Sequence, residues 1–122
     1  MTLDECIYNE LKNILPLYPL DAKPSNTDDY GIYSTVTDDE EKTLSGYIGL
    51  ITEEKEIDIM SKSYSQVKSI YKQLKDKIKT FQSNNIGVFV QDITFGEGSF
   101  ELWEDQIGMY RKILNFSITY QI

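Results

Sequence analysis

The sequence contains no histidine and only one cysteine, Cys6, which excludes several kinds of site. One cysteine cannot close an internal disulfide, and such a chain is typical of a reducing compartment. Protein zinc sites are built largely from cysteine and histidine, so we expect no zinc. A nucleophilic Cys6 would need a neighbouring base such as histidine. We therefore expect Cys6 to be a buried packing residue.

Long apolar runs and basic leader sequences are also absent. No run of about 18 apolar residues occurs, so we expect no transmembrane helix. The first ten residues, MTLDECIYNE, carry acidic side chains where a secretory signal carries basic ones. With 122 residues, of which 40% are hydrophobic and 12% aromatic, the sequence predicts a single domain over residues 1–122.

Motifs for catalysis are equally scarce. The glycines of residues 96–100 (GEGSF) lack the Gly-Lys-Ser/Thr end of a phosphate-binding loop, and no G-x-S-x-G elbow occurs. The acidic pairs Glu53-Glu54 and Glu104-Asp105 have neither the glycine nor the ligand spacing of an EF-hand. We expect no enzymatic activity, no metal and no cofactor.

The clearest structural pattern is a strand followed by a helix. Residues 56–59 alternate charged and apolar side chains, as a half-buried strand does. Ser63 with Gln66 three residues later forms a capping box. The sequence predicts a strand over 53–60 and a helix over 64–81. The apolar stripe of this helix comprises Val67, Ile70, Tyr71, Leu74, Ile78 and Phe81.

A helix is also predicted at the N-terminus, where Thr2 and Glu5 form a second capping box before a periodic apolar stripe. Pro16 and Pro19 are expected to end it and to begin an extended connector over residues 16–29.

Alternation and β-branched residues predict the remaining strands, and an asparagine after the second helix is expected to be its left-handed cap. The turn Asp38-Asp39-Glu40-Glu41 separates the first two of these strands. The predicted ranges are 30–37, 43–51, 86–95, 100–104 and 110–122. The order α-β-β-β-α-β-β-β with short links predicts an α+β fold: a largely antiparallel sheet with two helices packed on one face.

The net charge of −8 is unevenly distributed. Residues 62–79 carry six lysines against Asp76 alone, a local charge of +5, so the remainder carries −13. Two interpretations stay open: a solvated lysine face, or one half of a two-signed surface through which identical subunits meet. Specific DNA binding is disfavoured because most of the surface would repel phosphates. The candidate interface lysines are Lys68, Lys72 and Lys75.

Arg111 and Trp103 are each, like Cys6, the only residue of their type. Arg111, the only arginine, is either a structural ion pair or a subunit contact through a bidentate carboxylate pair. Trp103, the only tryptophan, is either a core residue or an interface anchor.

Three segments resemble a known family. The first is an N-terminal helix with a proline-bounded linker leading to YGIYSTV at 30–36. The second is IDIMSKSYSQVKSIYKQLKDKI at 57–78, a strand with a lysine-serine-tyrosine step into a helix. The third is MYRKILNFSITY at 109–120, an aromatic-arginine pair before a closing strand. In this order they resemble the tail-completion proteins of long-tailed bacteriophages, also called tail terminators or head–tail joining proteins.

The resemblance implies a structural virion protein, assembled in the host cytoplasm and located at the neck of the particle. It implies a homo-oligomeric ring, usually of six subunits, that caps the tail tube, ends tail elongation and joins tail to head. Its partners would be other copies of itself, the tail-tube protein and a head-completion or connector protein. DNA would pass through without specific binding. The acidic charge of this chain, rather than the resemblance, leads us to expect a pore-facing acidic loop formed by Asp38, Asp39, Glu40 and Glu41, because repulsion would keep DNA from sticking.

Two alternatives remain open at this point. One is a head-side connector or head-closure protein of a phage neck. The other is a phage-encoded adaptor that binds a host protein through an exposed sheet edge.

Overall fold

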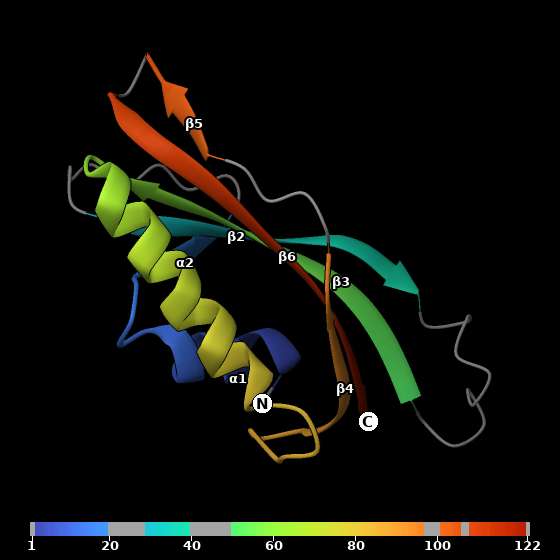
Figure 1. Cartoon of the computed structure of the whole chain (residues 1–122). Helices are drawn as coiled ribbons and strands as arrows, with labels where there is room; N and C mark the ends of the chain where they lie inside the picture. The colour runs from blue at the N-terminus through green and yellow to red at the C-terminus, as the bar shows by residue number, and fades with distance from the viewer. Residues whose placement is uncertain (1, 20–28, 40–49, 97–100, 106–107, 122) are drawn as a thin grey trace.

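The chain forms one mostly antiparallel sheet with helices on one of its faces, so the predicted α+β class and element order are confirmed (Figure 1). The computed structural model describes residues 2–19, 29–39, 50–96, 101–105 and 108–121. The helices are α1 (Leu3–Leu11) and α2 (Tyr64–Lys79). The strands are β1 (Leu17–Pro19), β2 (Tyr30–Asp39), β3 (Leu50–Ser61), β4 (Phe89–Phe95), β5 (Glu101–Glu104) and β6 (Met109–Gln121).

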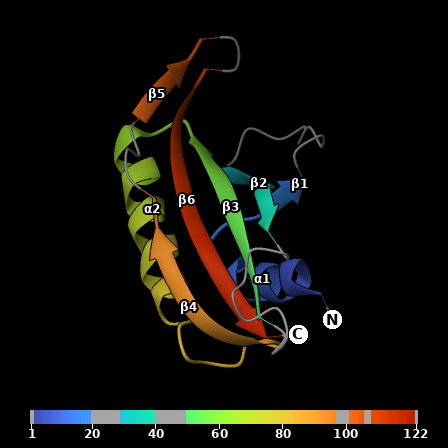
Figure 2. The ribbon, with the colours of Figure 1, turned by 90° about the vertical axis from the view of Figure 1, so that its right-hand side faces the viewer.

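The sheet is built around two long strands, β3 and β6, which pair along their whole length. The strand order is β1-β2-β3-β6-β4, and β5 pairs with the beginning of β6. Only the β1–β2 pair, among the described strands, is parallel. Figure 2 shows β3 and β6 running through most of the molecule, with β5 at one end and β4 toward the other.

Both predicted helix starts are present. The capping box of α1 is complete: Thr2 Oγ1 accepts from the Glu5 backbone N–H at 3.2 Å, and Glu5 Oε1 accepts from the Thr2 backbone N–H at 3.1 Å. In α2, Ser63 Oγ accepts from the Gln66 N–H at 3.3 Å. The Ser63 N–H, however, donates to Ser61 Oγ rather than to the Gln66 side chain. The nearby serine hydroxyl thus replaces half of the predicted box.

The core lies between the helices and the sheet. The predicted helical stripes face it, and Cys6 is fully buried, as its packing role requires. An ion pair of 3.4 Å between Lys77 and Glu10 joins the two helices, which lie side by side. Each fully buried aliphatic side chain contributes about 1.5–3 kcal/mol relative to exposure. The central members are Ile7, Leu11, Ile57, Val67, Leu74, Ile78, Leu114, Phe116 and Ile118.

The predicted connector contains a strand that the sequence pattern did not reveal. Leu17–Pro19 forms β1 and pairs in parallel with Gly31, Ile32 and Tyr33 of β2. Gly31 permits this close approach, because a Cβ there would lie 2.8 Å from Leu17 Cδ2 and 2.9 Å from Leu15 Cδ2. Residues 20–28 of the connector lie outside the described ranges.

Other predicted features differ as well, including the end of the second helix, which is Lys79 rather than residue 81. The predicted break between strands 43–51 and 53–60 is wrong, because β3 runs continuously from Leu50; residues 43–49 lie outside the described ranges. The residue with positive φ after α2 is Ser83, at 62°, not an asparagine. The strand predicted from residue 86 begins at Phe89.

Candidate functional site

A groove lies between α1 and the β1/β2 edge of the sheet, with a volume of about 370 Å³. Its wall is mostly apolar and aromatic, and two acidic side chains of the first turn of α1 lie along it. The sequence pattern did not predict this groove, because one of its walls, β1, is only three residues long. The alternation of Leu15 and Leu17 with their neighbours is the one local signal of that strand. We call it the N-terminal groove; it is lined by Asp4, Glu5, Tyr8, Leu17, Tyr18, Pro19, Tyr33, Ser34 and Thr35.

Under this groove lies a charge network centred on Lys55, whose side chain is fully buried. Lys55 Nζ donates to Glu53 Oε1 at 2.5 Å and to Thr35 Oγ1 at 2.7 Å, and it pairs with Asp4 Oδ1 at 3.0 Å. The Tyr33 hydroxyl donates to Asp4 at 2.7 Å. Burial, followed by this bond to a carboxylate, raises the pKa of Tyr33 above its ordinary value. The network ties α1, β2 and β3 together beneath the groove.

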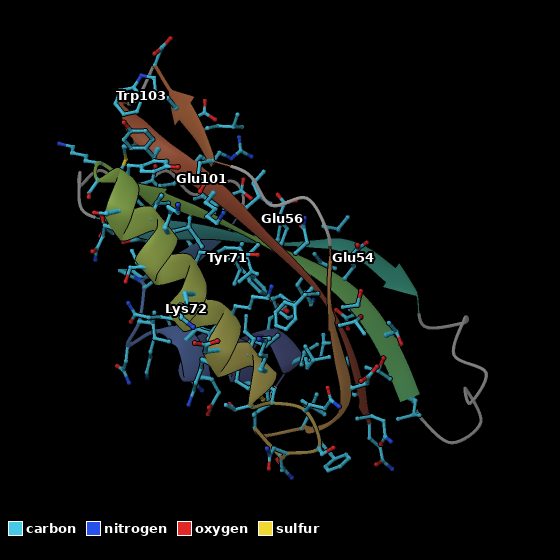
Figure 3. All side chains as sticks on the ribbon, viewed as in Figure 1. Glu54, Glu56, Tyr71, Lys72, Glu101 and Trp103 are labelled. Carbon is cyan, nitrogen blue, oxygen red and sulfur yellow. The ribbon has the colours of Figure 1, made fainter. Side chains whose placement is uncertain are left out.

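At the far end of the molecule, three aromatic rings meet where α2 and β6 begin and β5 ends. Tyr110 makes edge contacts with Trp103, at 4.8 Å between centroids, and with Tyr64, at 5.4 Å. Trp103 is 51% exposed, so it is a surface residue rather than a core residue (Figure 3). Leu102, which precedes it in β5, is 39% exposed on the opposite face of the strand. Exposed tryptophan and tyrosine are the residues that most often anchor protein interfaces.

The three candidate interface lysines differ in environment. Lys72 is exposed on α2 and pairs with Asp76 at 3.1 Å (Figure 3). Lys68 is half-exposed, lies over the Tyr64 ring and is 4.0 Å from Glu101. Lys75 is partly buried over the Tyr71 and Phe95 rings, at 5.7 and 5.1 Å. Lys68 therefore belongs to the aromatic end, whereas Lys75 packs along the sheet.

Arg111 forms a structural ion-pair bridge on the outer face, the sheet face opposite the helices. Its guanidinium donates to Asp58 at 2.5 Å and to Glu104 at 3.1 Å. Burial alone would lower the pKa of Arg111, but the hydrogen bonds and charges of Glu104 and Asp58 outweigh it and raise that pKa above its ordinary value. The bridge joins β3, β5 and β6, so it holds the β5–β6 hairpin against the central sheet.

Glu56 lies next to this bridge on the same face. A hydrogen bond with Asp58, then burial and the Asp58 charge, raise the pKa of Glu56 to about 7, while Arg111 acts in the opposite direction. Asp58 Oδ1 is buried and has no conventional hydrogen-bond donor among the described residues. A proton held on Glu56 would supply that donor.

The predicted acidic turn is only partly described. Asp38 and Asp39 belong to β2, where they pair with Glu53 and Thr52 of β3, so the turn does not begin at Asp38 as predicted. Glu40 and Glu41 lie outside the described ranges.

The residues that the structure describes lack two further kinds of feature. No three His, Cys, Asp or Glu side chains there come close enough to hold a metal ion. Neither described helix is long and apolar enough to cross a membrane.

Comparison with known proteins gives a likeness to a solved structure over nearly the whole chain. No protein-family model matches the sequence, and no curated protein matches it. Among solved structures, the chain is similar to a protein in the virion of a native gene transfer agent (GTA) particle. The TM-score is 0.66 and the identity 12%, and the alignment covers 98% of this chain and 95% of that one. This likeness shows a shared fold over essentially the full length of both chains.

Proposed function

We propose that this protein is a structural virion protein that forms a ring, with six subunits, at the head–tail junction of a phage-like particle. In this function it caps the tail tube, ends tail elongation and joins the tail to the head. Its partners are copies of itself, the tail-tube protein and a head-completion or connector protein.

The observation that carries the proposal is the fold shared, end to end, with a component of a GTA virion. That likeness was found independently of the three segments that resemble tail-completion proteins. A fold alone does not fix a function. The shared fold and the three family-like segments support each other, because both point to a phage-like particle.

The surface of the protein is compatible with assembly. It carries a groove at one sheet edge and exposed aromatic residues near the other. Different patches that meet head to tail generate a closed ring when the rotations between successive subunits add up to a full turn.

The test is electron microscopy of the purified full-length protein, alone and mixed with assembled tail tubes. The proposal expects rings of uniform diameter on one end of each tube, and tubes that no longer elongate. Tubes that continue to elongate with bare ends would overturn it.

The pore-facing position of Asp38, Asp39, Glu40 and Glu41 is a separate part of the proposal. Reversing all four to lysine is expected to slow DNA passage, because a cationic lining would bind phosphates. The measurement is infectivity or DNA delivery by particles that contain the variant. Normal delivery by correctly assembled particles would count against this position.

A further inference from the structure

We propose that the aromatic end of one subunit docks into the N-terminal groove of the next, so that identical chains join head to tail. The tip patch is defined as Tyr64, Lys68, Trp103 and Tyr110. The proposal rests on the ring-forming function above and adds the two surfaces that meet.

The positions of the two surfaces fit a heterologous contact. The groove is formed by α1 with β1 and β2, at one edge of the strand order, whereas β5 lies on the other side of β6. Figures 1 and 2 place β5 at one end of the molecule and α1 toward the other. Each subunit would therefore give its tip to one neighbour and its groove to another, as a closed ring requires.

Both surfaces expose apolar area that a partner would cover. In the tip patch, Trp103 and Tyr64 are 51% and 47% exposed, and in the groove Tyr8 is 47% exposed. The groove volume of about 370 Å³ lies within the range of cavities that bury organic ligands. An indole side chain has the size and polarity for such a site, and its N–H would lie near the carboxylates of the groove.

Charge complementarity selects a second copy as the occupant. The groove carries Asp4 and Glu5, and the charge of Lys55 beneath it is already shared between Asp4 and Glu53. The tip carries Lys68, with exposed Lys62 nearby in sequence at the start of α2. A basic aromatic patch facing an acidic aromatic groove favours the head-to-tail pair.

The charges on the helix side of the tip leave a small surplus of positive charge. Glu101 lies between Lys68 and Lys112, at 4.0 and 3.5 Å. Lys62 and Asp105 are the further charges nearby in sequence, whereas Arg111 is held by Asp58 and Glu104 on the outer face. Two tips facing each other would bring their lysines together, which disfavours an isologous contact.

Cysteine cross-linking tests the contact even when association is weak. Tyr8→Cys and Trp103→Cys each place one reactive thiol on the surface, because native Cys6 is fully buried. A mixture of the two variants is treated with a short bis-maleimide and analysed by mass spectrometry. We expect the mixed dimer to exceed both homodimers together several-fold, and Tyr8→Cys mixed with Lys79→Cys to show no such excess. Mixed dimer at or below the statistical proportion, or no cross-link at any concentration, would overturn the contact.

Two disabling variants then test the direction of assembly. Tyr8→Arg places a cation in the groove, and Trp103→Ser removes the anchor of the tip. Each alone is expected to weaken self-association about tenfold or more. Mixed, they retain one intact groove and one intact tip, so association should return but stop at a one-to-one dimer in light scattering. Self-association of either variant at the wild-type level would overturn the proposal.

Matched controls change exposed residues outside both surfaces. Asn13→Arg adds a charge beyond the end of α1, and Phe89→Ser removes an exposed aromatic residue from β4. Both should assemble like the wild type. Rings on tube ends without the Tyr8–Trp103 cross-link would overturn this contact and leave the proposed function standing. Tubes without rings would overturn the function itself.

Discussion

Lys55 and Arg111 each hold a group of carboxylates, but they do so on opposite faces of the same sheet. Lys55 is fully buried on the helix-covered face, where Asp4, Glu53 and Thr35 bind its ammonium group. The side chain of Arg111 is 32% exposed on the outer face, between two carboxylates.

The difference separates a folding role from a positioning role. The Lys55 network attaches the first turn of α1 to the sheet, and without this attachment the N-terminal groove would lose one wall. The Arg111 bridge attaches β5, and therefore Trp103, to the central strands. One network underlies the groove and the other orients the tip, so both proposed assembly surfaces depend on buried or half-buried charges.

The largest effect is expected from Lys55→Ala. Removing the buried cation leaves Glu53 without its positive partner in a mostly buried position, and loss of one partner of a buried ion pair costs about 3–5 kcal/mol. Chemical denaturation of both proteins measures the change in the free energy of unfolding.

The matched control is Lys72→Ala, which removes an exposed lysine from the pair with Asp76 on the surface of α2. Its expected cost is below about 1 kcal/mol, because solvent screens exposed pairs. Equal losses in the two variants would show that burial of Lys55 contributes nothing.

Arg111→Met should have an intermediate effect. It leaves Asp58, of whose side chain only 11% is exposed, without its cation. An unsatisfied buried group costs about 1–3 kcal/mol. Hydrogen exchange should also become faster in Glu101–Glu104, because β5 loses its link through Glu104 to the bridge.

Arg111→Lys is the control for charge alone. A lysine keeps the positive charge but lacks the planar fork that binds two carboxylates at once. We expect partial recovery of stability and little recovery of exchange protection in β5. Unchanged protection of β5 in Arg111→Met would contradict the positioning role.

The sequence predicted the elements whose information is local. The helix predicted at 64–81, which the structure ends at Lys79, and strand β6 follow from spacing within one segment, and the Thr2 capping box from two residues three apart. Strand β1 was missed because three residues carry too little pattern, and its pairing with β2 depends on a distant glycine, Gly31.

The buried lysine illustrates the same limit for a site. Alternation places Lys55 on the same face as Ile57 and Ile59, so the predicted strand indicates that the Lys55 side chain points inward. Its partners Asp4 and Thr35 come from other elements, and only the folded chain brings them together. The two assembly surfaces are non-local in the same way, since residues from several elements form each one.

The smallest effect is a dependence of stability on pH that arises from Glu56. Its folded pKa of about 7 lies above the ordinary value of 4.5, so between these pH values the folded protein binds more protons than the unfolded chain. This contribution to stability is present at low pH and is lost as the pH rises toward 7. Because solvent screens Glu56, we expect this contribution to be smaller than the losses of stability in Lys55→Ala and Arg111→Met.

Glu56→Gln isolates this contribution, because the amide of glutamine can donate to Asp58 Oδ1 at every pH. The Tm of this variant minus that of the wild type should be near zero at pH 4.5 and should increase through neutral pH. Glu54→Gln removes a neighbouring carboxylate from the same face and should give a curve nearly parallel to the wild type. If Glu56→Gln were also parallel, the two carboxyl groups on the outer face would not share a proton.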